Sequence, residues 1–167
     1  MTNLYLKIID ELEKNRQAFI QKGMTPPRFI DIWDGQLYDE NYEFVYPCIF
    51  FDYAANWTYA GKTKTGTATV ELHVIADPLP DCSNVSKRLS EGLKRLDYYQ
   101  IVADILEGIN TENTTYLSLI NESPVTTDYG IYHKLTFQTT VQRTYLNSDM
   151  TGRIEDINIK QPKIYTI

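Results

Sequence analysis

The side chains best suited to chemistry in this sequence of 167 residues are its two histidines, His73 and His133. Each lies in a stretch where apolar and polar residues alternate, which is typical of a β-strand with one buried face. His73 falls on the polar side of its stretch beside Glu71, whereas His133 falls in register with the apolar side of its own. Metal binding or catalysis would require both rings to share a face with an acid or a cysteine. The opposite registers predict that they do not, so we expect hydrogen-bonded strand histidines, with His73 at the surface or in an interface.

A second chemical motif is Gly61-Lys62-Thr63, which matches the end of a phosphate-binding loop. The complete motif requires a glycine five residues before Gly61, where this chain has Asn56. A helix should also follow the loop, but the residues from Thr67 onward alternate like a strand. We therefore interpret residues 54–66 as a loop between two strands, with residues 61–66 as the tip of the hairpin.

The remaining reactive side chains do not form a recognisable site. The acids between Asp31 and Glu43 invite comparison with a calcium loop, but their spacing does not match one and Trp33 interrupts them. Cys48 is expected to be a buried thiol in the core and Cys82 a thiol in a loop. The two cysteines are too far apart in the sequence to match the ligand pair of a metal site. No serine or threonine lies in a nucleophile motif. The sequence thus predicts no catalytic residue, no metal, no cofactor and no enzyme.

Composition limits the class of protein. The chain is 43% hydrophobic and 23% charged, as in an ordinary globular domain. No apolar run approaches the roughly 18 residues of a membrane span, and the first residues lack the features of a signal peptide. The net charge is −6, with a mildly basic stretch (residues 61–96) between acidic flanks, which is a poor fit to sequence-specific DNA binding. The 13 tyrosines favour strands and interfaces, and so indicate self-assembly.

The elements that must position these residues follow from periodicity. Apolar residues at helical spacing predict helices over residues 3–20 and 97–108, and a weaker one over 83–95. Thr2 or Asn3 is the expected cap of the first helix, and Asp97 of the last. Gly23 and Gly108 are the expected helix ends.

Alternation and turn residues predict the strands. They are expected at residues 48–53, 67–77, 116–120 and 131–143, with a break or a sheet edge at Ser123-Pro124. Residues 29–38 contain Asp34-Gly35, a strong hairpin-turn signal, and are expected to form a small hairpin. Grouped strands separated by helices indicate an α+β fold. We expect a mostly antiparallel sheet with two main helices on one face and a long central hairpin. Residues 1–144 would form one domain, with residues 29–38 as an insertion and residues 145–167 as a C-terminal arm.

The order of several stretches resembles a known family. The stretches are Tyr46-Pro47-Cys48-Ile49-Phe50-Phe51-Asp52 with Trp57, then Gly66-Thr67-Ala68-Thr69-Val70-Glu71-Leu72-His73-Val74, the helix of residues 98–108, and Thr127-Asp128-Tyr129-Gly130. Over roughly residues 1–143 this order is similar to the tail-terminator, or tail-completion, proteins of long-tailed bacteriophages and prophages. The resemblance implies a homo-oligomeric ring, usually hexameric, that ends growth of the tail tube and joins the tail to the head–tail connector. It implies the tail tube protein and the connector protein as partners, and a location in the neck of the virion after assembly in the host cytoplasm. DNA would pass through the ring without specific binding, and acidic walls would suit that role.

A ring of identical subunits needs two different surfaces that fit each other. The expected donors are the edge strands, the tip of the central hairpin and the polar arm with its apolar end. The candidate contact residues are Trp57, Tyr59, Lys62, Lys64, His73, Ile164 and Tyr165. Three alternatives stay open. One is another ring of the phage neck, such as a head-completion protein. The second is an unrelated α+β ligand-binding module with a deep pocket lined by Tyr and Trp. The third is an enzyme, which would need His73, His133 and an acid to converge within hydrogen-bond reach.

Overall fold

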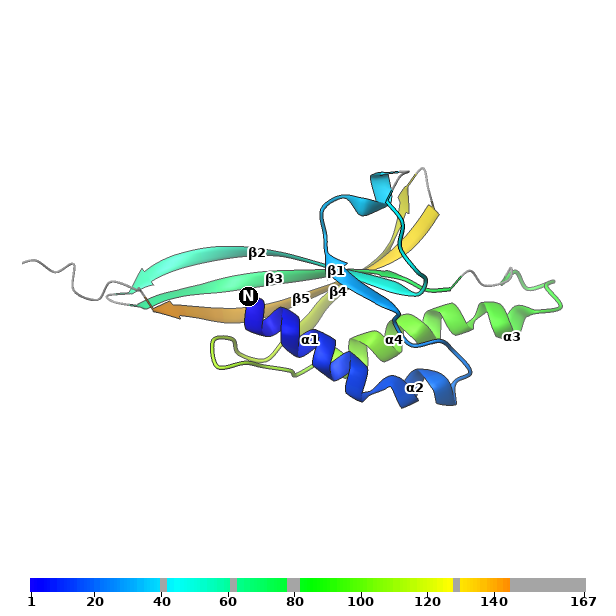
Figure 1. Cartoon of the computed structure of the whole chain (residues 1–167), viewed down its shortest axis with the longest axis horizontal. Helices are drawn as coiled ribbons and strands as arrows, with labels where there is room; N and C mark the ends of the chain where they lie inside the picture. The colour runs from blue at the N-terminus through cyan, green and yellow to red at the C-terminus, as the bar shows by residue number, and fades with distance from the viewer. Residues whose placement is uncertain (40–41, 61–62, 78–81, 128–129, 145–167) are drawn as a thin grey trace, which may run out of the picture.

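The computed structural model describes residues 1–39, 42–60, 63–77, 82–127 and 130–144 (Figure 1). Its strands are β1 (Phe29–Ile32), β2 (Cys48–Ala60), β3 (Thr63–Ile75), β4 (Ser118–Thr127) and β5 (Gly130–Thr144). Its helices are α1 (Thr2–Lys14), α2 (Arg16–Gln21), the 3-10 helix η1 (Gln36–Tyr38), α3 (Leu89–Gly92) and α4 (Lys94–Leu106). The strands form one sheet in the order β1-β2-β3-β5-β4, antiparallel except for the β1–β2 pair. Figure 1 shows the helices α1, α2 and α4 on one side of this sheet, so the predicted α+β class is confirmed.

The central hairpin is formed by β2 and β3, and it is longer than predicted. Pairing runs without interruption from Cys48↔Ile75 to Ala60↔Thr63. β3 also pairs with β5 along most of its length, from Thr63↔Thr144 to Val74↔His133. Residues 54–60 have no clean alternation, which is why the sequence indicated a loop there. Backbone hydrogen bonds to β3 extend the strand regardless of side-chain pattern.

The main core lies between the helices and one face of the sheet. The first helix contributes Leu4, Ile8 and Leu12, α4 contributes Tyr98, Val102 and Leu106, and the sheet contributes Phe51, Val70, Leu72, Val74, Leu135 and Phe137. Each of the aliphatic and phenylalanine side chains here stabilises the fold by about 1.5–3 kcal/mol through burial. The predicted apolar stripes and the apolar side of β3 are therefore confirmed.

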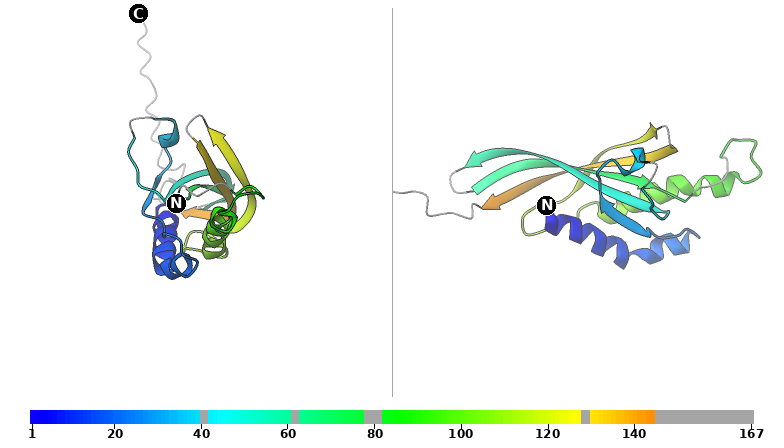
Figure 2. Two further views of the ribbon diagram at one scale, coloured as in Figure 1. Left: turned by 90° about the vertical axis from the view of Figure 1, so that its right-hand side faces the viewer. Right: turned by 45° about the horizontal axis from the view of Figure 1, so that its top comes forward.

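The opposite face of the sheet is also covered near the start of β2, contrary to prediction. A second buried cluster consists of Cys48, Phe50, Ile75 and Tyr132, against which Phe29, Trp33, Leu37, Tyr42, Phe44 and Val125 pack. The end-on view in Figure 2 shows η1 and the β4–β5 end rising on this side of the sheet, away from the helices. The expectation that this side of β3 is solvated throughout was wrong, because segments distant in sequence cover it.

The predicted hairpin over residues 29–38 was also wrong. β1 pairs with β2 in parallel, starting at Phe29↔Cys48, and residues 36–38 form η1 instead of a return strand. Gly35 does reverse the chain, with φ of 80°. The Gln36 side chain then closes the turn, accepting from the Asp34 N–H at 2.7 Å and donating to the Ile32 carbonyl at 2.6 Å. The Asp34-Gly35 signal therefore predicted the chain reversal correctly, but β1 pairs with β2 and not with residues 36–38.

The helix ends differ from prediction in three places. The helix expected over residues 3–20 is interrupted at Asn15, whose Nδ2 donates to the Glu11 carbonyl at 2.9 Å. Neither Thr2 nor Asn3 caps it, since Met1 occupies that position without a side-chain bond. Asp97 lies inside α4, which begins at Lys94 because α3 leads directly into it.

The predicted helix ends at Gly23 and Gly108 and the predicted sheet edge at Ser123-Pro124 are confirmed. Gly23 and Gly108, with φ of 67° and 79°, follow α2 and α4 as expected. β4 is the outer strand of the sheet and continues through Pro124, so that part of the chain is an edge, as proposed, and not a break.

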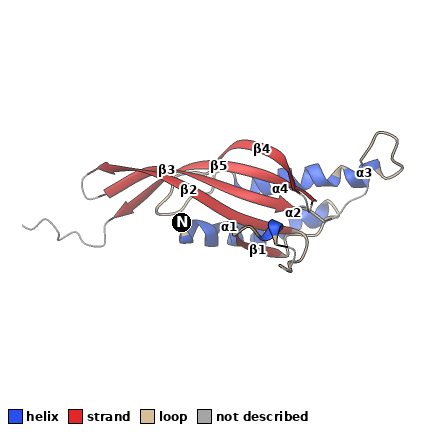
Figure 3. Ribbon diagram, turned by 90° about the horizontal axis from the view of Figure 1, so that it is seen from above, coloured by secondary structure: helices blue, strands red, loops and turns tan. Residues whose placement is uncertain are grey.

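The outer halves of β2, β3 and β5 extend beyond the helix layer. In Figures 1 and 3 these three strands continue past the N-terminus of α1 as a ribbon. We call this part of the sheet, residues 53–60, 63–69 and 138–144, the ribbon.

Candidate functional site

The structure describes four of the seven predicted contact residues. Trp57 lies on β2 in the ribbon with 36% of its surface exposed. Tyr59 and Lys64 are cross-strand partners close to the end of the central hairpin. Lys62, Ile164 and Tyr165 lie outside the described residues, as does the predicted arm. His73 is the fourth, and its environment differs most from expectation.

His73 is buried, with 5% of its surface exposed, so the prediction of a surface or interface histidine was wrong. Its ring stacks on Trp33, with centroids 4.1 Å apart and planes 13° from parallel. Tyr132 of β5 packs at 5.1 Å. The sequence placed His73 correctly on the face away from the helices, but it gave no sign that the chain following β1 folds over that face.

His133 lies on the other face of the sheet, as its register predicted. It stacks on Tyr99 of α4, with ring centroids 4.3 Å apart and planes 9° from parallel. Its Nε2 atom is 3.9 Å from Glu122 Oε2. Because the two histidines are on opposite faces, they cannot act on one substrate.

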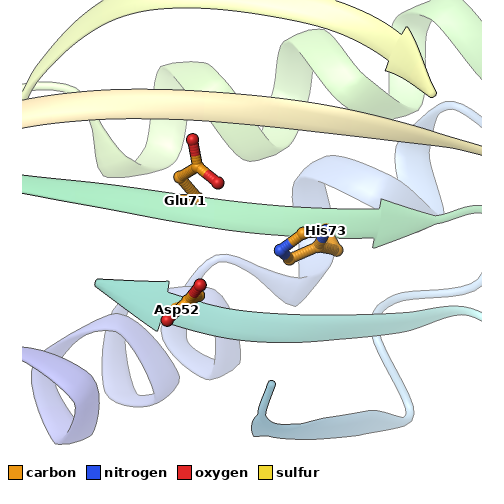
Figure 4. Close-up of side chains that lie close together, drawn as sticks. All are labelled: Asp52, Glu71 and His73. Atoms are coloured by element: carbon orange, nitrogen blue, oxygen red, sulfur yellow. The ribbon is translucent and has the colours of Figure 1, made fainter. Parts of the chain in front are cut away.

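Two acids accompany His73. Asp52 on β2 is the cross-strand partner of Glu71 on β3, and His73 follows Glu71 by two residues on the same face. Ligating atoms from the three side chains all lie within 4.8 Å of one another. Figure 4 shows a ring nitrogen of His73 facing the two carboxyl groups. We call Asp52, Glu71 and His73 the acid–histidine cluster; within the described part of the chain, no other group of three or more His, Cys, Asp or Glu side chains comes as close.

A lysine completes the surroundings of the cluster. Lys134 on β5 is the cross-strand partner of His73, and its Nζ lies 3.0 Å from Glu71 Oε1. Burial lowers the pKa of His73, an effect that Lys134 reinforces and that the charges of Glu71 and Asp52 oppose. The ring is therefore a neutral imidazole at pH 7. Neither of its nitrogens has a hydrogen-bond partner among the described residues.

Three other candidate groups lie apart from this cluster. Asp31, in the acidic stretch compared with a calcium loop, accepts hydrogen bonds from the Tyr42 hydroxyl and the Ile32 N–H, both at 2.8 Å. Burial raises the pKa of Cys48 to about 12, so its thiol is a poor nucleophile. Cys82 is exposed in a loop, as predicted.

No protein-family model matches this chain, and a search of curated proteins finds no match. None of the described helices has the length and apolarity needed to cross a membrane.

A groove lies under the ribbon, beside the N-terminus of α1. It has a volume of about 640 Å³ and is lined by Met1, Tyr53, Trp57, Thr111, Val141 and Arg143 among others. Tyr53 and Trp57 point to the helix side of the sheet, where the helix layer has already ended. Sequence reasoning selected Trp57 but missed Tyr53, the last residue of the strand predicted over residues 48–53, because the sequence does not show that β2 continues beyond the helix layer.

A second hollow lies near the other end of the molecule. It has a volume of about 280 Å³, is mostly apolar, and lies between the start of α4 and the start of β5. Leu93, Leu96 and Ile131 line it and are all exposed. The sequence gave no signal for it, because it forms only where the α3–α4 junction meets the β4–β5 hairpin.

Proposed function

We propose that this protein is a structural subunit of a phage or prophage virion, a tail terminator that forms a ring at the head–tail junction. The ring would end growth of the tail tube and join the tail to the connector. The resemblance of residues 1–143 to that family suggests the role. The observation that carries the proposal is a pair of exposed apolar patches that lie well apart along an elongated subunit, one beside the N-terminus of α1 and one at the start of α4.

The first patch consists of Tyr53 and Trp57 on the ribbon, above the groove beside α1. We call it the ribbon patch. Aromatic side chains of this kind are enriched at protein interfaces, where their large rings are buried while a polar atom stays bonded. No described residue covers these rings fully, so a partner can bury them.

The second patch consists of Leu93, Leu96 and Ile131 around the smaller hollow. We call it the end patch. Leu96 has 60% of its surface exposed although it belongs to α4. In Figure 1 the start of α4 lies well away from the N-terminus of α1, beside which the ribbon patch lies.

Two different patches that lie well apart on one subunit favour a head-to-tail contact between copies. A contact of this type repeats from subunit to subunit and closes into a ring when the rotation permits. The ribbon patch of one copy would occupy the end patch of the next. Six copies would follow the usual size in the family, and the net charge of −6 suits a lumen through which DNA passes without being held.

The first experiment measures the mass of the purified protein in solution by light scattering. A ring of six 19.4 kDa chains has a mass of about 116 kDa. Trp57→Asp and Leu96→Asp should each reduce the assembly to monomers, because each buries a charge in the contact. Leu6→Asp is the matched control, since Leu6 is 56% exposed on α1 and belongs to neither patch.

Mixing the two defective variants tests the head-to-tail geometry itself. Trp57→Asp keeps an intact end patch and Leu96→Asp keeps an intact ribbon patch, so together they should form one contact and stop at dimers. A wild-type protein that stays monomeric at high concentration would refute the ring. A ring that does not cap purified tail tubes in electron micrographs would leave the assembly correct and the tail-terminator role wrong.

A further inference from the structure

We propose that Asp52, Glu71 and His73 form a binding site for a divalent transition-metal ion, with Zn²⁺ as the best-fitting example. The acid–histidine cluster offers two carboxylates and one imidazole from two adjacent strands. This site lies on the opposite face of the sheet from the groove and does not depend on the proposed ring.

The spacing of the ligands fits one ion after small side-chain movements. Zn²⁺ binds oxygen and nitrogen ligands at about 2.0–2.2 Å, which places them roughly 3.3–3.6 Å from one another around a tetrahedral ion. The ligating atoms of the cluster lie within 4.8 Å of one another. Asp52 and Glu71 are only partly buried, so rotation of their side chains can close the difference.

His73 supplies the independent observation. It is nineteen-twentieths buried, and neither ring nitrogen has a partner among the described residues. A buried polar atom without a partner is costly, and a bound ion is one of the explanations for it. One nitrogen faces the carboxyl groups (Figure 4). Stacking on Trp33 and packing against Tyr132 fix the ring plane, which leaves this nitrogen already oriented as a ligand.

The Lys134 side chain competes with a metal ion for the carboxylate of Glu71. Its ammonium group, 3.0 Å from Glu71 Oε1, partly neutralises the carboxylate of Glu71. Its side chain is 27% exposed, so it can move toward solvent when an ion binds Glu71. The alternative is that no metal ion binds and that the Lys134 ammonium group is the permanent counter-ion of the cluster.

The mixed ligand set selects the kind of ion. Mg²⁺ and Ca²⁺ prefer sites made entirely of oxygen, whereas imidazole together with carboxylate suits Zn²⁺ and its neighbours in the transition series. Three protein ligands leave a fourth position of a tetrahedral ion open to water. The ion would tie β2 to β3 beside the ring that Trp33 covers, and would hold the second cluster on the sheet.

The test uses the full chain, freed of metal with a chelator and carrying Cys82→Ser so that the exposed thiol cannot bind the ion. Calorimetric titration with Zn²⁺ should give one site per chain. At about a hundredfold excess over the dissociation constant, bound Zn²⁺ should raise the melting temperature by roughly 5 °C or more. Co²⁺ in place of Zn²⁺ should give a visible absorption band.

Variants assign the ligands. Zn²⁺ binding should weaken by at least about tenfold in each of the variants Asp52→Asn, Glu71→Gln and His73→Gln. Replacing a residue that only hydrogen-bonds to a metal ligand already costs about tenfold in affinity, so loss of a ligand itself should cost no less. Lys134→Met should strengthen binding, because it removes the competing cation. His133→Gln is the matched control, since this histidine pairs with Glu122 on the other face and should leave the affinity unchanged.

Two results would overturn the proposal. One is the absence of saturable Zn²⁺ binding by the folded protein. The other is binding that Asp52→Asn and Glu71→Gln leave unchanged. These two side chains are partly exposed, so their variants should fold even if His73→Gln does not. If Lys134 were the only cation of the cluster, Lys134→Met would lower stability and no Zn²⁺ would bind.

Discussion

Replacing Gly66 with alanine should destabilise the protein through a single backbone contact. Gly66 lies in β3 opposite Trp57 of β2, within the ribbon. A Cβ atom at this position would lie 2.4 Å from the carbonyl oxygen of Asn56 and 3.2 Å from the Cα of Trp57. Both are backbone atoms of the neighbouring strand, so no side-chain rotation can relieve the clash. Gly66 is therefore required for close approach of two backbones.

The size of the effect follows from this distance. An ordinary van der Waals contact begins at 3.4 Å, so the Asn56 oxygen must retreat by 1.0 Å. Forced shifts of this kind in packed structure cost about 1–3 kcal/mol. The retreat also disturbs the β2–β3 ladder, and one lost backbone hydrogen bond adds about 1 kcal/mol. We expect a loss of about 2–4 kcal/mol in the free energy of unfolding, which corresponds to a melting temperature lower by roughly 5–15 °C for a chain of this size.

Urea denaturation followed by circular dichroism measures this loss, and calorimetry checks the melting temperature. Thr67→Ala is the matched control, because Thr67 is exposed one residue away in the same strand and the variant introduces the same side chain. It should cost less than about 1 kcal/mol, the range of β propensity. A Gly66→Ala protein within about 0.5 kcal/mol of wild type would show that β2 and β3 do not approach as closely as described.

Two further predictions concern buried side chains. The Tyr98 hydroxyl is buried with no hydrogen-bond partner among the described residues, so Tyr98→Phe should cost less than about 0.5 kcal/mol or stabilise the protein. Tyr42→Phe is its control in urea denaturation and should cost about 1 kcal/mol or more, because that hydroxyl donates to Asp31 at 2.8 Å. Burial lowers the pKa of His133, although Glu122 opposes the shift. In the unfolded chain, the His133 imidazole takes up a proton near its ordinary pKa of about 6.5, whereas in the folded chain it stays neutral to a lower pH. The stability of the fold therefore decreases as the pH falls from about 6.5 to the lowered pKa of the folded state. His133→Gln should reduce this fall, and a proton NMR titration of the histidine signals giving His133 a pKa of 6.5 or above would contradict the argument.

Those parts of the fold that depend on local periodicity could be predicted from the sequence. Leu4, Ile8 and Leu12 recur every four residues, and all three are buried under the sheet. Val70, Leu72 and Val74 alternate, and all three lie in the main core. In each case the buried face is decided by spacing within one element, which the sequence displays directly.

The environment of His73 could not be predicted in this way. Its burial depends on Trp33, which is 40 positions away in the sequence and reaches the ring only because β1 pairs in parallel with β2. The Asp34-Gly35 signal pointed to a local hairpin, and nothing in the sequence ranks a parallel partner above it. Polar residues on one side of a strand indicate solvent only when no other segment covers that side.

The acid–histidine cluster was missed for a different reason, which is strand register. Asp52 lies opposite Glu71 because pairing continues without a bulge from Ala60↔Thr63 to Cys48↔Ile75. Reading residues 54–66 as a loop left the register of the hairpin open, so no cross-strand pair could be assigned. A hairpin with strands extended to residues 60 and 63 would have placed the two acids side by side from the sequence alone.

The two proposals use opposite faces of the same strand, which makes their tests independent. Successive residues of β2 point to alternate sides of the sheet, so Asp52 faces away from the helices whereas Trp57 faces the groove beside α1. Trp57→Asp should therefore dissociate the ring without changing Zn²⁺ affinity, and Glu71→Gln should weaken Zn²⁺ binding without changing the mass of the assembly. A change in both properties from either substitution would mean that the site forms only in the assembled ring. In that case the neighbouring copy would supply a ligand, and dilution of the wild-type protein to monomers would release the metal.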